Sequence, residues 1–206
     1  MGSEGKGGIV TTGLRIGIGH DTHRLRPGGP LRLGGVDIPH DREFVAHSDG
    51  DVVLHALIDA LLGAAALGDV GQMFPDTDPA NHGRDSTEML AAARDAVTAV
   101  GWRIGNLDCI VFAERPRLLP HRQTIRQRIA EILNIEPERV SVKGKTGEHV
   151  GPVGREEAIA AECIVLLEPG EGERDERRMT NSAGGCWVRR DPADAVSGLF
   201  FPIPNP

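Results

Sequence analysis

Two histidines and one aspartate near the start of the chain have types and spacings that suit a metal site. Asp21 and His23 are two residues apart, so in an extended segment both side chains point to the same side. His55 lies in an apolar stretch, four residues after Asp51 and four before Asp59, which places these three on one helix face. Two imidazoles and one carboxylate leave a fourth tetrahedral position open, as in catalytic zinc sites.

Each of these residues also has a simpler interpretation. An Asp-x-His pattern occurs often by chance, and a single helical histidine is more often a packed or surface residue than a ligand. Asp51 could be only the N-cap of the helix, or Asp51 or Asp59 could orient a metal-bound imidazole from behind it. The spacing alone therefore favours a divalent-metal site, with zinc as the expected ion, without establishing it.

Hydrophobic periodicity predicts the elements that would hold these residues. Strands are expected over residues 14–19, 31–36, 107–112, 139–143 and 158–167. Helices are expected over 51–67, from Asp85 to Val100, and from Pro120 onward. Gly68 would end the first helix, and a long loop over 68–85 would follow it. The order β-β-α-α-β-α-β-β predicts an α+β fold in a single domain, with a mixed sheet of four to five strands and helices on one face.

Composition narrows the function classes. The chain has 206 residues, of which 39% are hydrophobic and only 3% aromatic, so one aliphatic core is expected. The net charge of −7 argues against a nucleic-acid binder, which needs a basic surface. Cys109, Cys163 and Cys186 are odd in number and widely spaced, so buried or incidental thiols are expected rather than a disulfide framework.

The two ends of the chain differ in composition from the part between them. Residues 1–13 are expected to form a flexible leader, and residues 14–169 the folded domain. Residues 170–206 are polar and rich in Gly and Pro, and we expect a disordered or loosely docked tail. The leader lacks the apolar core of a secretory signal, and the longest apolar stretch is too short and too polar to span a membrane. A cytoplasmic protein is therefore expected.

Longer motifs surround the metal residues and resemble those of one enzyme family. Asp21-Thr-His23 is followed by Ala-His-Ser-Asp-Gly-Asp-Val-Val-Leu-His over 46–55, Asp-Ala-Leu-Leu-Gly-Ala-Ala-Ala-Leu-Gly-Asp over 59–69, and Phe-Pro-Asp-Thr-Asp over 74–78. These motifs, and the sequence over about 14–169, are similar to the 2-C-methyl-D-erythritol 2,4-cyclodiphosphate synthases. The resemblance implies a non-mevalonate isoprenoid enzyme that converts 4-diphosphocytidyl-2-C-methyl-D-erythritol 2-phosphate to the cyclic diphosphate and CMP. It also implies a homotrimer with active sites between subunits, and a fold similar to the Bacillus chorismate mutase class.

The resemblance also implies roles for individual residues. Zinc, one ion per subunit, would lie on the triad, and Glu148 would hold a magnesium or manganese ion that bridges the substrate phosphates. His47 and Thr146 would stabilise the transition state. The implied substrate contacts are Asp21, Thr22, His23, His47 and Ser48; Asp69, Val70 and Gly71 at the ribose; Phe74, Pro75, Asp76, Thr77 and Asp78 at the methylerythritol; Ala113, Glu114, Arg115, Pro116, Arg117, Leu118 and Leu119 at the cytosine; and Lys145, Thr146, Gly147, Glu148, Pro152 and Arg155.

Two stretches depart from the family pattern. Lys145-Thr-Gly-Glu148 stands where the family often has Thr-Thr-Thr-Glu, and Lys145 could still contact a phosphate as a point charge. Pro152 replaces an aromatic residue near a central channel that in the family can hold an isoprenoid diphosphate, with Arg155 near its mouth.

Two other functions are compatible with the same residues. A zinc-dependent phosphohydrolase would use the open metal position to activate water. A non-enzymatic trimeric protein could instead bind isoprenoid diphosphates as a sensor. The products separate these alternatives, because a hydrolase gives a linear phosphate and a sensor gives no turnover.

Overall fold

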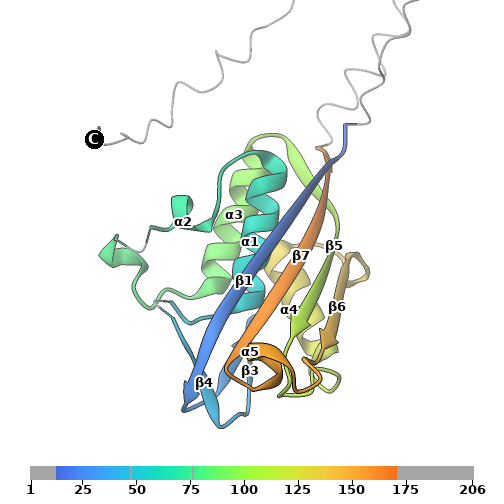
Figure 1. Cartoon of the computed structure of the whole chain (residues 1–206). Coiled ribbons are helices and arrows are strands. Elements are labelled where there is room, and N and C mark those ends of the chain that lie inside the picture. The colour runs from blue at the N-terminus through green and yellow to red at the C-terminus, as the bar shows by residue number, and fades with distance from the viewer. Residues whose placement is uncertain (1–12, 47, 76, 171–206) are drawn as a thin grey trace, which may run out of the picture. The chain divides into compact units, whose positions relative to one another are not determined.

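A five-stranded sheet forms the centre of the computed structural model, which describes residues 13–46, 48–75 and 77–170 (Figure 1). Its strands run in the order β4-β1-β7-β5-β6. They are β1 (Arg15–Pro27), β4 (Arg42–Val45), β5 (Trp102–Phe112), β6 (Val140–Lys145) and β7 (Ala158–Pro169). Neighbours are antiparallel except β5 and β6, which are parallel. The expected α+β domain with a mixed sheet is confirmed. Except for Gly13 and Gly170, the predicted leader and tail lie outside the described residues.

The strands differ from the prediction in several places, and β5 begins five residues before its predicted start at 107. β1 continues past its predicted end at residue 19, so Asp21 and His23 lie within it. In place of one strand over 31–36 there is a hairpin of β2 (Leu31–Leu33) and β3 (Val36–Ile38), because the two glycines between them adopt left-handed φ angles of 61° and 75°. β4 has no counterpart among the predicted strands, since only one of its four residues is buried and no alternation is visible.

The helices begin and end close to the predicted residues. α1 (Val52–Ala65) begins after its cap at Asp51, and it ends at Ala66, which takes the left-handed conformation expected of Gly68. The predicted loop over 68–85 contains two short helical turns. The remaining elements are α2 (Val70–Met73), the 3₁₀ turns Pro79–Asn81 and Pro137–Arg139, α3 (Ser86–Ala99), α4 (Arg122–Leu133) and α5 (Gly151–Gly154).

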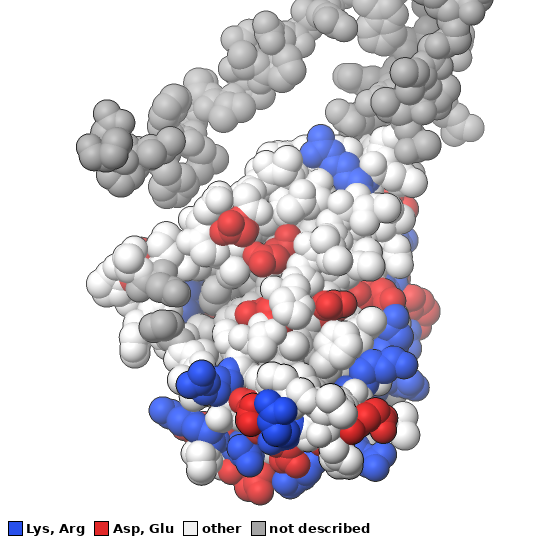
Figure 2. Space-filling view, in the orientation of Figure 1, with Lys and Arg blue, Asp and Glu red and all other residues white. Residues whose placement is uncertain are grey.

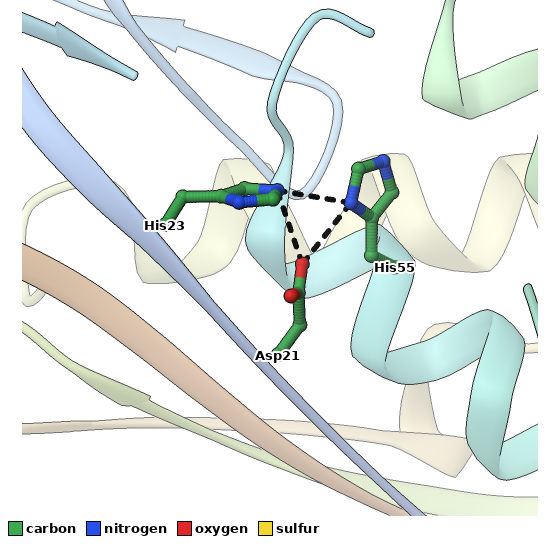
Figure 3. A group of neighbouring side chains, drawn as sticks. All are labelled: Asp21, His23 and His55. Carbon is green, nitrogen blue, oxygen red and sulfur yellow. Dashed lines mark hydrogen bonds and ion pairs between the residues drawn. The ribbon is translucent and has the colours of Figure 1, made fainter. Parts of the chain in front are cut away.

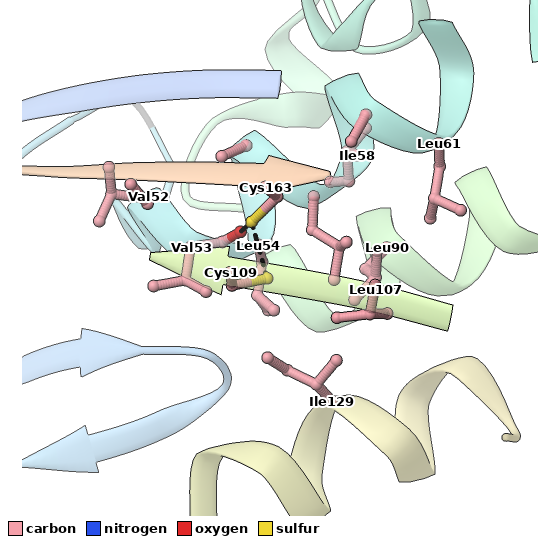
Figure 4. Packing of buried hydrophobic residues seen from close by; sticks show 14 of the residues in the cluster. Val52, Val53, Leu54, Ile58, Leu61, Leu90, Leu107, Cys109, Ile129 and Cys163 are labelled. Atoms are coloured by element: carbon pink, nitrogen blue, oxygen red, sulfur yellow. Dashed lines mark hydrogen bonds between the residues drawn. The ribbon is translucent and has the colours of Figure 1, made fainter. Parts of the chain in front are cut away.

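The core lies between the sheet and the helices α1, α3 and α4, which cover one face (Figure 1). In Figure 4, Leu54 and Ile58 of α1 lie near Leu90 of α3 and Leu107 of β5, and all four side chains are fully buried. The long α1 has hardly any exposed residue, which explains the continuous apolar character of its sequence. The prediction of an aliphatic core with helices on one face is therefore confirmed.

Two glycines on β1 bring the helix α1 unusually close to the sheet. A Cβ atom on Gly17 would lie 1.9 Å from the carbonyl oxygen of Ala60, and one on Gly19 would lie 2.0 Å from that of Ala56. No side chain fits at either position without moving backbone. The approach fixes β1 against α1, the two elements that carry the predicted metal ligands.

Two of the three cysteines lie opposite one another in the core. Cys109 on β5 pairs with Cys163 on β7 across the antiparallel ladder, and both are fully buried free thiols. Their sulfur atoms are 2.8 Å apart (Figure 4). Buried thiols were expected and are confirmed for this pair, whereas Cys186 lies outside the described residues.

The face of β1 and β7 that points away from α1 carries exposed isoleucines. Ile16 and Ile18 of β1 are 73% and 69% exposed, and Ile164 of β7 is 48% exposed. Figure 2 shows this face, with uncharged atoms over much of its middle and Lys and Arg side chains gathered toward its lower end. Across the described ranges, no helix has the length and apolar character needed to cross a membrane.

Candidate metal centre

Asp21, His23 and His55 meet where β1 packs on α1 (Figure 3). Asp21 Oδ2 is 3.0 Å from His55 Nδ1 and 3.1 Å from His23 Nε2, and these two nitrogens are 3.1 Å apart. The alternation of β1 turns both of its ligand residues toward the helix, as their two-residue spacing predicts. Within the described residues, this is the one group of three such side chains that could hold a metal ion.

The donor atoms of the triad fit a divalent metal such as zinc. A tetrahedral zinc ion with bonds of about 2.0–2.1 Å holds its ligand atoms about 3.3 Å apart, close to the spacings found here. Two imidazole nitrogens and one carboxylate oxygen form one side of the tetrahedron. All three residues line one cavity, so a substrate oxygen or a water molecule there could complete the coordination of a bound ion.

Burial and charge act in opposite directions on the three groups. Burial lowers the pKa of His23 despite the nearby carboxylate. Burial also opposes the charged form of His55, but the hydrogen bond with Asp21 and its charge outweigh burial and raise this pKa. For Asp21, burial favours the neutral carboxyl, yet the bond with His55 and the two imidazoles lower its pKa. A metal ion would replace the proton shared between these groups, because ligand histidines must be neutral.

The two aspartates on the His55 face of α1 have other partners than its imidazole. Asp51 is fully buried and accepts four backbone N–H bonds, two at the start of α1 and two from the β2–β3 turn. Asp59 Oδ1 accepts a bond from the backbone N–H of Val70 at 2.7 Å. The simpler interpretation of Asp51 as a helix cap is therefore confirmed, and neither aspartate forms a hydrogen bond with the His55 imidazole among the described residues.

Ser86, which no motif selected, contacts the outer nitrogen of His55, and Asp49 contacts Ser86 in turn. His55 Nε2 is 2.9 Å from the hydroxyl oxygen of Ser86, at the start of α3. Ser86 in turn donates to Asp49 Oδ1 at 2.5 Å. A hydroxyl at the start of a predicted helix is ordinarily taken as part of its cap, and only the tertiary arrangement shows its proximity to an imidazole on another helix.

A cavity of about 280 Å³ opens beside the triad. Besides Asp21 and His23 of the triad, its wall includes four of the implied substrate contacts, namely Ser48, Val70, Gly71 and Phe74. The ring of Phe74 is almost fully buried, and the Arg84 guanidinium lies over it at 4.9 Å from the centroid. The structure therefore brings the metal triad together with parts of the implied ribose and methylerythritol sites.

The implied cytosine residues lie around a second cavity of about 380 Å³. Its lining includes Ala113, Arg117, Leu118 and Leu119, together with Lys145 and Thr146 at the end of β6. Among the described residues, no side chain lines both this cavity and the one beside the triad. One chain thus presents the two halves of the implied active site as separate cavities.

The other implied residues occupy varied positions. Thr22 contacts His20 at 3.0 Å on the side of the sheet away from the triad, and Thr146 donates to Glu148 at 2.8 Å. Arg155 pairs with Glu157 at 2.9 Å on the surface. Glu114, Arg115 and Pro116 line a third cavity of about 460 Å³, which Arg117 also borders. The exposed residues among the rest are Asp69, Pro75, Thr77, Asp78 and Pro152, and Gly147 is half-buried. His47 and Asp76 lie outside the described residues.

Comparison with known proteins identifies the family. The sequence model of the YgbB family matches residues 14–168, which is most of the chain. The chain belongs to the YgbB family. This range of the YgbB domain contains every residue to which the motifs assign a role, and the resemblance inferred from those motifs is confirmed.

Curated members of the YgbB family are similar over most of their length. The chain is 56% identical over 146 residues to the 2-C-methyl-D-erythritol 2,4-cyclodiphosphate synthase of Gemmatimonas aurantiaca, covering 71% of this chain and 88% of that protein. It is 51% identical over 158 residues to the synthase of that name from a Nostoc strain, covering 77% and 96%. The IspF–CDP complex of Plasmodium falciparum matches the fold with a TM-score of 0.69 at 36% identity, covering 78% of this chain and 99% of that one.

Proposed function

We propose that the chain converts 4-diphosphocytidyl-2-C-methyl-D-erythritol 2-phosphate to 2-C-methyl-D-erythritol 2,4-cyclodiphosphate and CMP. This lyase reaction belongs to the non-mevalonate pathway of isoprenoid biosynthesis, and curated YgbB relatives carry the name of this activity. The observation that supports it most directly is the Asp21–His23–His55 triad on the wall of a cavity. The CDP complex of a structural relative adds that the same fold binds a cytidine diphosphate group.

The reaction needs positioning and neutralisation of charge rather than a protein nucleophile. An oxygen of the 2-phosphate forms a bond to the β-phosphorus, and the bond from that phosphorus to the CMP oxygen breaks. Zinc held by the triad would supply Lewis-acid polarisation of a β-phosphate oxygen when bound. The residues around the triad hold the reacting ends in contact, with Val70 and Gly71 at the ribose and Phe74 shielding the methylerythritol side.

The phosphates also need groups from the second cavity. Thr146 and Glu148 share a hydrogen bond at the exposed end of β6, and we place them, with Lys145, on the phosphates. Glu148 would hold a magnesium or manganese ion, since hard oxygen ligands suit these ions. His47, which lies outside the described residues, would stabilise the transition state together with Thr146.

We further propose that a homotrimer unites the two halves, so that each active site lies between subunits. The separation of the two cavities within one chain supports this assembly, because the substrate carries its cytosine and its methylerythritol at opposite ends. The isoleucines on the open face of β1 and β7 supply an apolar surface for it. The fold would then resemble the Bacillus chorismate mutase class, with Arg155 and Pro152 near a central channel and the enzyme in the cytoplasm.

Release of CMP from the diphosphocytidyl substrate tests the proposed activity. Purified, metal-loaded protein should give CMP and a cyclic diphosphate, whose mass distinguishes it from a hydrolysed linear phosphate. Absence of CMP would overturn the proposal, and a linear product would favour the phosphohydrolase. Tight binding of isoprenoid diphosphate without any turnover would favour the sensor.

The zinc ligands are tested separately by metal analysis. His55→Ala should lose bound zinc, whereas His82→Ala, at an exposed histidine outside the triad, should retain it. Full zinc occupancy in the His55 variant would contradict the ligand set.

A further inference from the structure

The two nitrogens of the His55 imidazole face different surroundings. Nδ1 points to the triad, 3.0 Å from Asp21 and 3.1 Å from His23. Nε2 points away from it, 2.9 Å from the Ser86 hydroxyl and 3.2 Å from the Ser48 hydroxyl. Because a metal ligand needs its lone pair on the coordinating nitrogen, the bond at Nε2 decides whether Nδ1 can coordinate.

The Ser86 hydroxyl has its proton committed to a carboxylate. Its oxygen lies 2.5 Å from Asp49 Oδ1, and the backbone N–H of Ser86 donates to Asp49 Oδ2 at 3.0 Å. An ionised carboxylate can only accept, so the hydroxyl proton must point to Asp49. The same oxygen can then only accept from His55, which requires an imidazole proton on Nε2, and in the neutral ring that binds a metal this leaves the lone pair on Nδ1.

Arg32 fixes the carboxylate at the far end of this chain of bonds. Its guanidinium makes an ion pair with Asp49 Oδ2 at 3.0 Å and another with Asp85 at 3.1 Å. Burial of Arg32 disfavours its charged form, but the surrounding carboxylates outweigh burial and raise its pKa. Ser86 itself is fully buried, so water does not compete for its hydroxyl.

We infer that Ser86 and Asp49 are positioning residues for the metal centre. Both residues act through His55. They keep a proton on its Nε2 and hold the imidazole ring in the orientation that points Nδ1 at the triad. Neither residue lines the cavity beside the triad or belongs to the triad, and the sequence motifs give neither this role. The inference rests on the proposed metal site and adds residues that determine how tightly that site holds its ion.

Zinc affinity of the full chain, measured by competition with a chromophoric chelator, tests the inference. Ser86→Ala should weaken zinc binding by about 10- to 100-fold, the usual effect of losing a partner behind a ligand histidine. Asp49→Asn should also weaken it, because an amide can donate to the Ser86 oxygen and turn the hydroxyl proton toward His55. Thr98→Ala is the matched control, since it removes another hydroxyl from α3 that contacts only a backbone carbonyl.

A second measurement separates positioning from a merely structural role. Nitrogen NMR shifts of metal-free protein should show a proton on His55 Nε2 in the wild type, whatever proton Nδ1 shares with Asp21, and a mixture that includes the tautomer protonated on Nδ1 alone in Ser86→Ala. Ser48→Ala should leave the tautomer unchanged, because the longer Ser48 contact has no carboxylate behind it.

The outcomes distinguish this inference from the metal proposal. Unchanged zinc affinity and tautomer in both the Ser86 and Asp49 variants, with zinc bound by the wild type, would overturn the positioning role alone. Failure of the wild type to bind zinc would overturn the metal site and this inference with it. If Ser86→Ala does not fold, Asp49→Asn, which preserves side-chain volume, gives the same readouts.

Discussion

Asp59 on α1 accepts a 2.7 Å hydrogen bond from the backbone N–H of Val70, the first residue of α2. Asp59 lies one turn after His55 on the same helix, and Val70 lines the cavity beside the triad. One helix therefore carries a proposed metal ligand and also fixes the turn that we assign to the ribose. The position of the substrate relative to the metal depends on this single rigid element.

Removing the Asp59 carboxylate should loosen that turn without affecting the metal. Asp59→Ala leaves the Val70 N–H without its acceptor, and about 1–2 kcal/mol of lost hydrogen bonding would raise KM by about 5- to 30-fold. Zinc affinity should remain within about threefold of wild type, since Asp59 is not a ligand. Asp59→Asn keeps an acceptor oxygen and should retain most of the activity. Equal losses in both variants would show that the charge, rather than the hydrogen bond, matters.

Gly19, one of the two glycines at which β1 closely approaches α1, should tolerate no side chain. Gly19→Ala places a methyl group 2.0 Å from the Ala56 carbonyl, so the helix must move. We expect a loss of about 3 kcal/mol or more in the free energy of unfolding, measured by urea denaturation, and weaker zinc binding. Gly63→Ala is the control, because its methyl group meets nothing within 4 Å and should stabilise α1 by up to about 1 kcal/mol. A stable Gly19 variant with normal zinc affinity would contradict the geometry.

Burial of Asp51 predicts a specific pH dependence of stability. Burial raises its pKa from an ordinary 3.8 to about 6, although backbone N–H groups oppose the shift. Between these values the folded state holds a proton that the unfolded chain has lost. The contribution of Asp51 to the free energy of unfolding therefore falls as the pH rises through this window, by up to about 1.4 kcal/mol per pH unit. Below the window the contribution is fully present.

Asp51→Asn provides the comparison for this titration. Its unfolding free energy should lack the proton-linked change, so the difference between wild type and variant should vary with pH only inside the window. Chemical denaturation at a series of pH values measures that difference. A constant difference from pH 4 to 7 would mean that Asp51 stays ionised in the folded protein.

The open face of the sheet should mediate assembly. Ile18→Glu places a charge where we expect apolar contact between subunits, and a cost of at least about 2 kcal/mol would weaken association about thirtyfold. Sedimentation at micromolar concentration should show a trimer for the wild type and smaller species for the variant. CMP release should fall, while zinc binding should persist because the triad belongs to one chain. Val100→Glu, at an exposed position on the helix side, is the control. A wild-type protein that sediments as a monomer would rule out an active site shared between subunits.

The metal triad could be predicted because its spacings are local. Two residues along a strand and one turn of a helix fix the directions of Asp21, His23 and His55 once those elements are known. The role of Ser86 could not be predicted, because its contact with His55 depends on how α3 packs beside α1. Local spacing also suggested Asp51 as an orienting group, whereas the structure uses it to satisfy backbone donors.

The element boundaries missed by periodicity have similar causes. Ala66 ends α1 in a left-handed conformation that a glycine would adopt more easily, so Gly68 was the stronger local signal. β4 has too few buried residues to show alternation and exists because β1 offers it an edge. These features are determined by the partners of each segment rather than by the segment itself.

The pairing of β1 with β7 sets the order of events during synthesis. Asp21 and His23 lie opposite Ala161 and Ile159, so the first and last strands of the domain are neighbours. Chains are made from the N-terminus at about 5–20 residues per second, and contacts this distant in sequence form late. The helix α1 follows β1 early in the chain, but the ribosome must deliver nearly the whole domain before the strand that pairs with the two ligand residues of β1 exists. The sheet that supports the metal triad is therefore completed only when the domain has been synthesised.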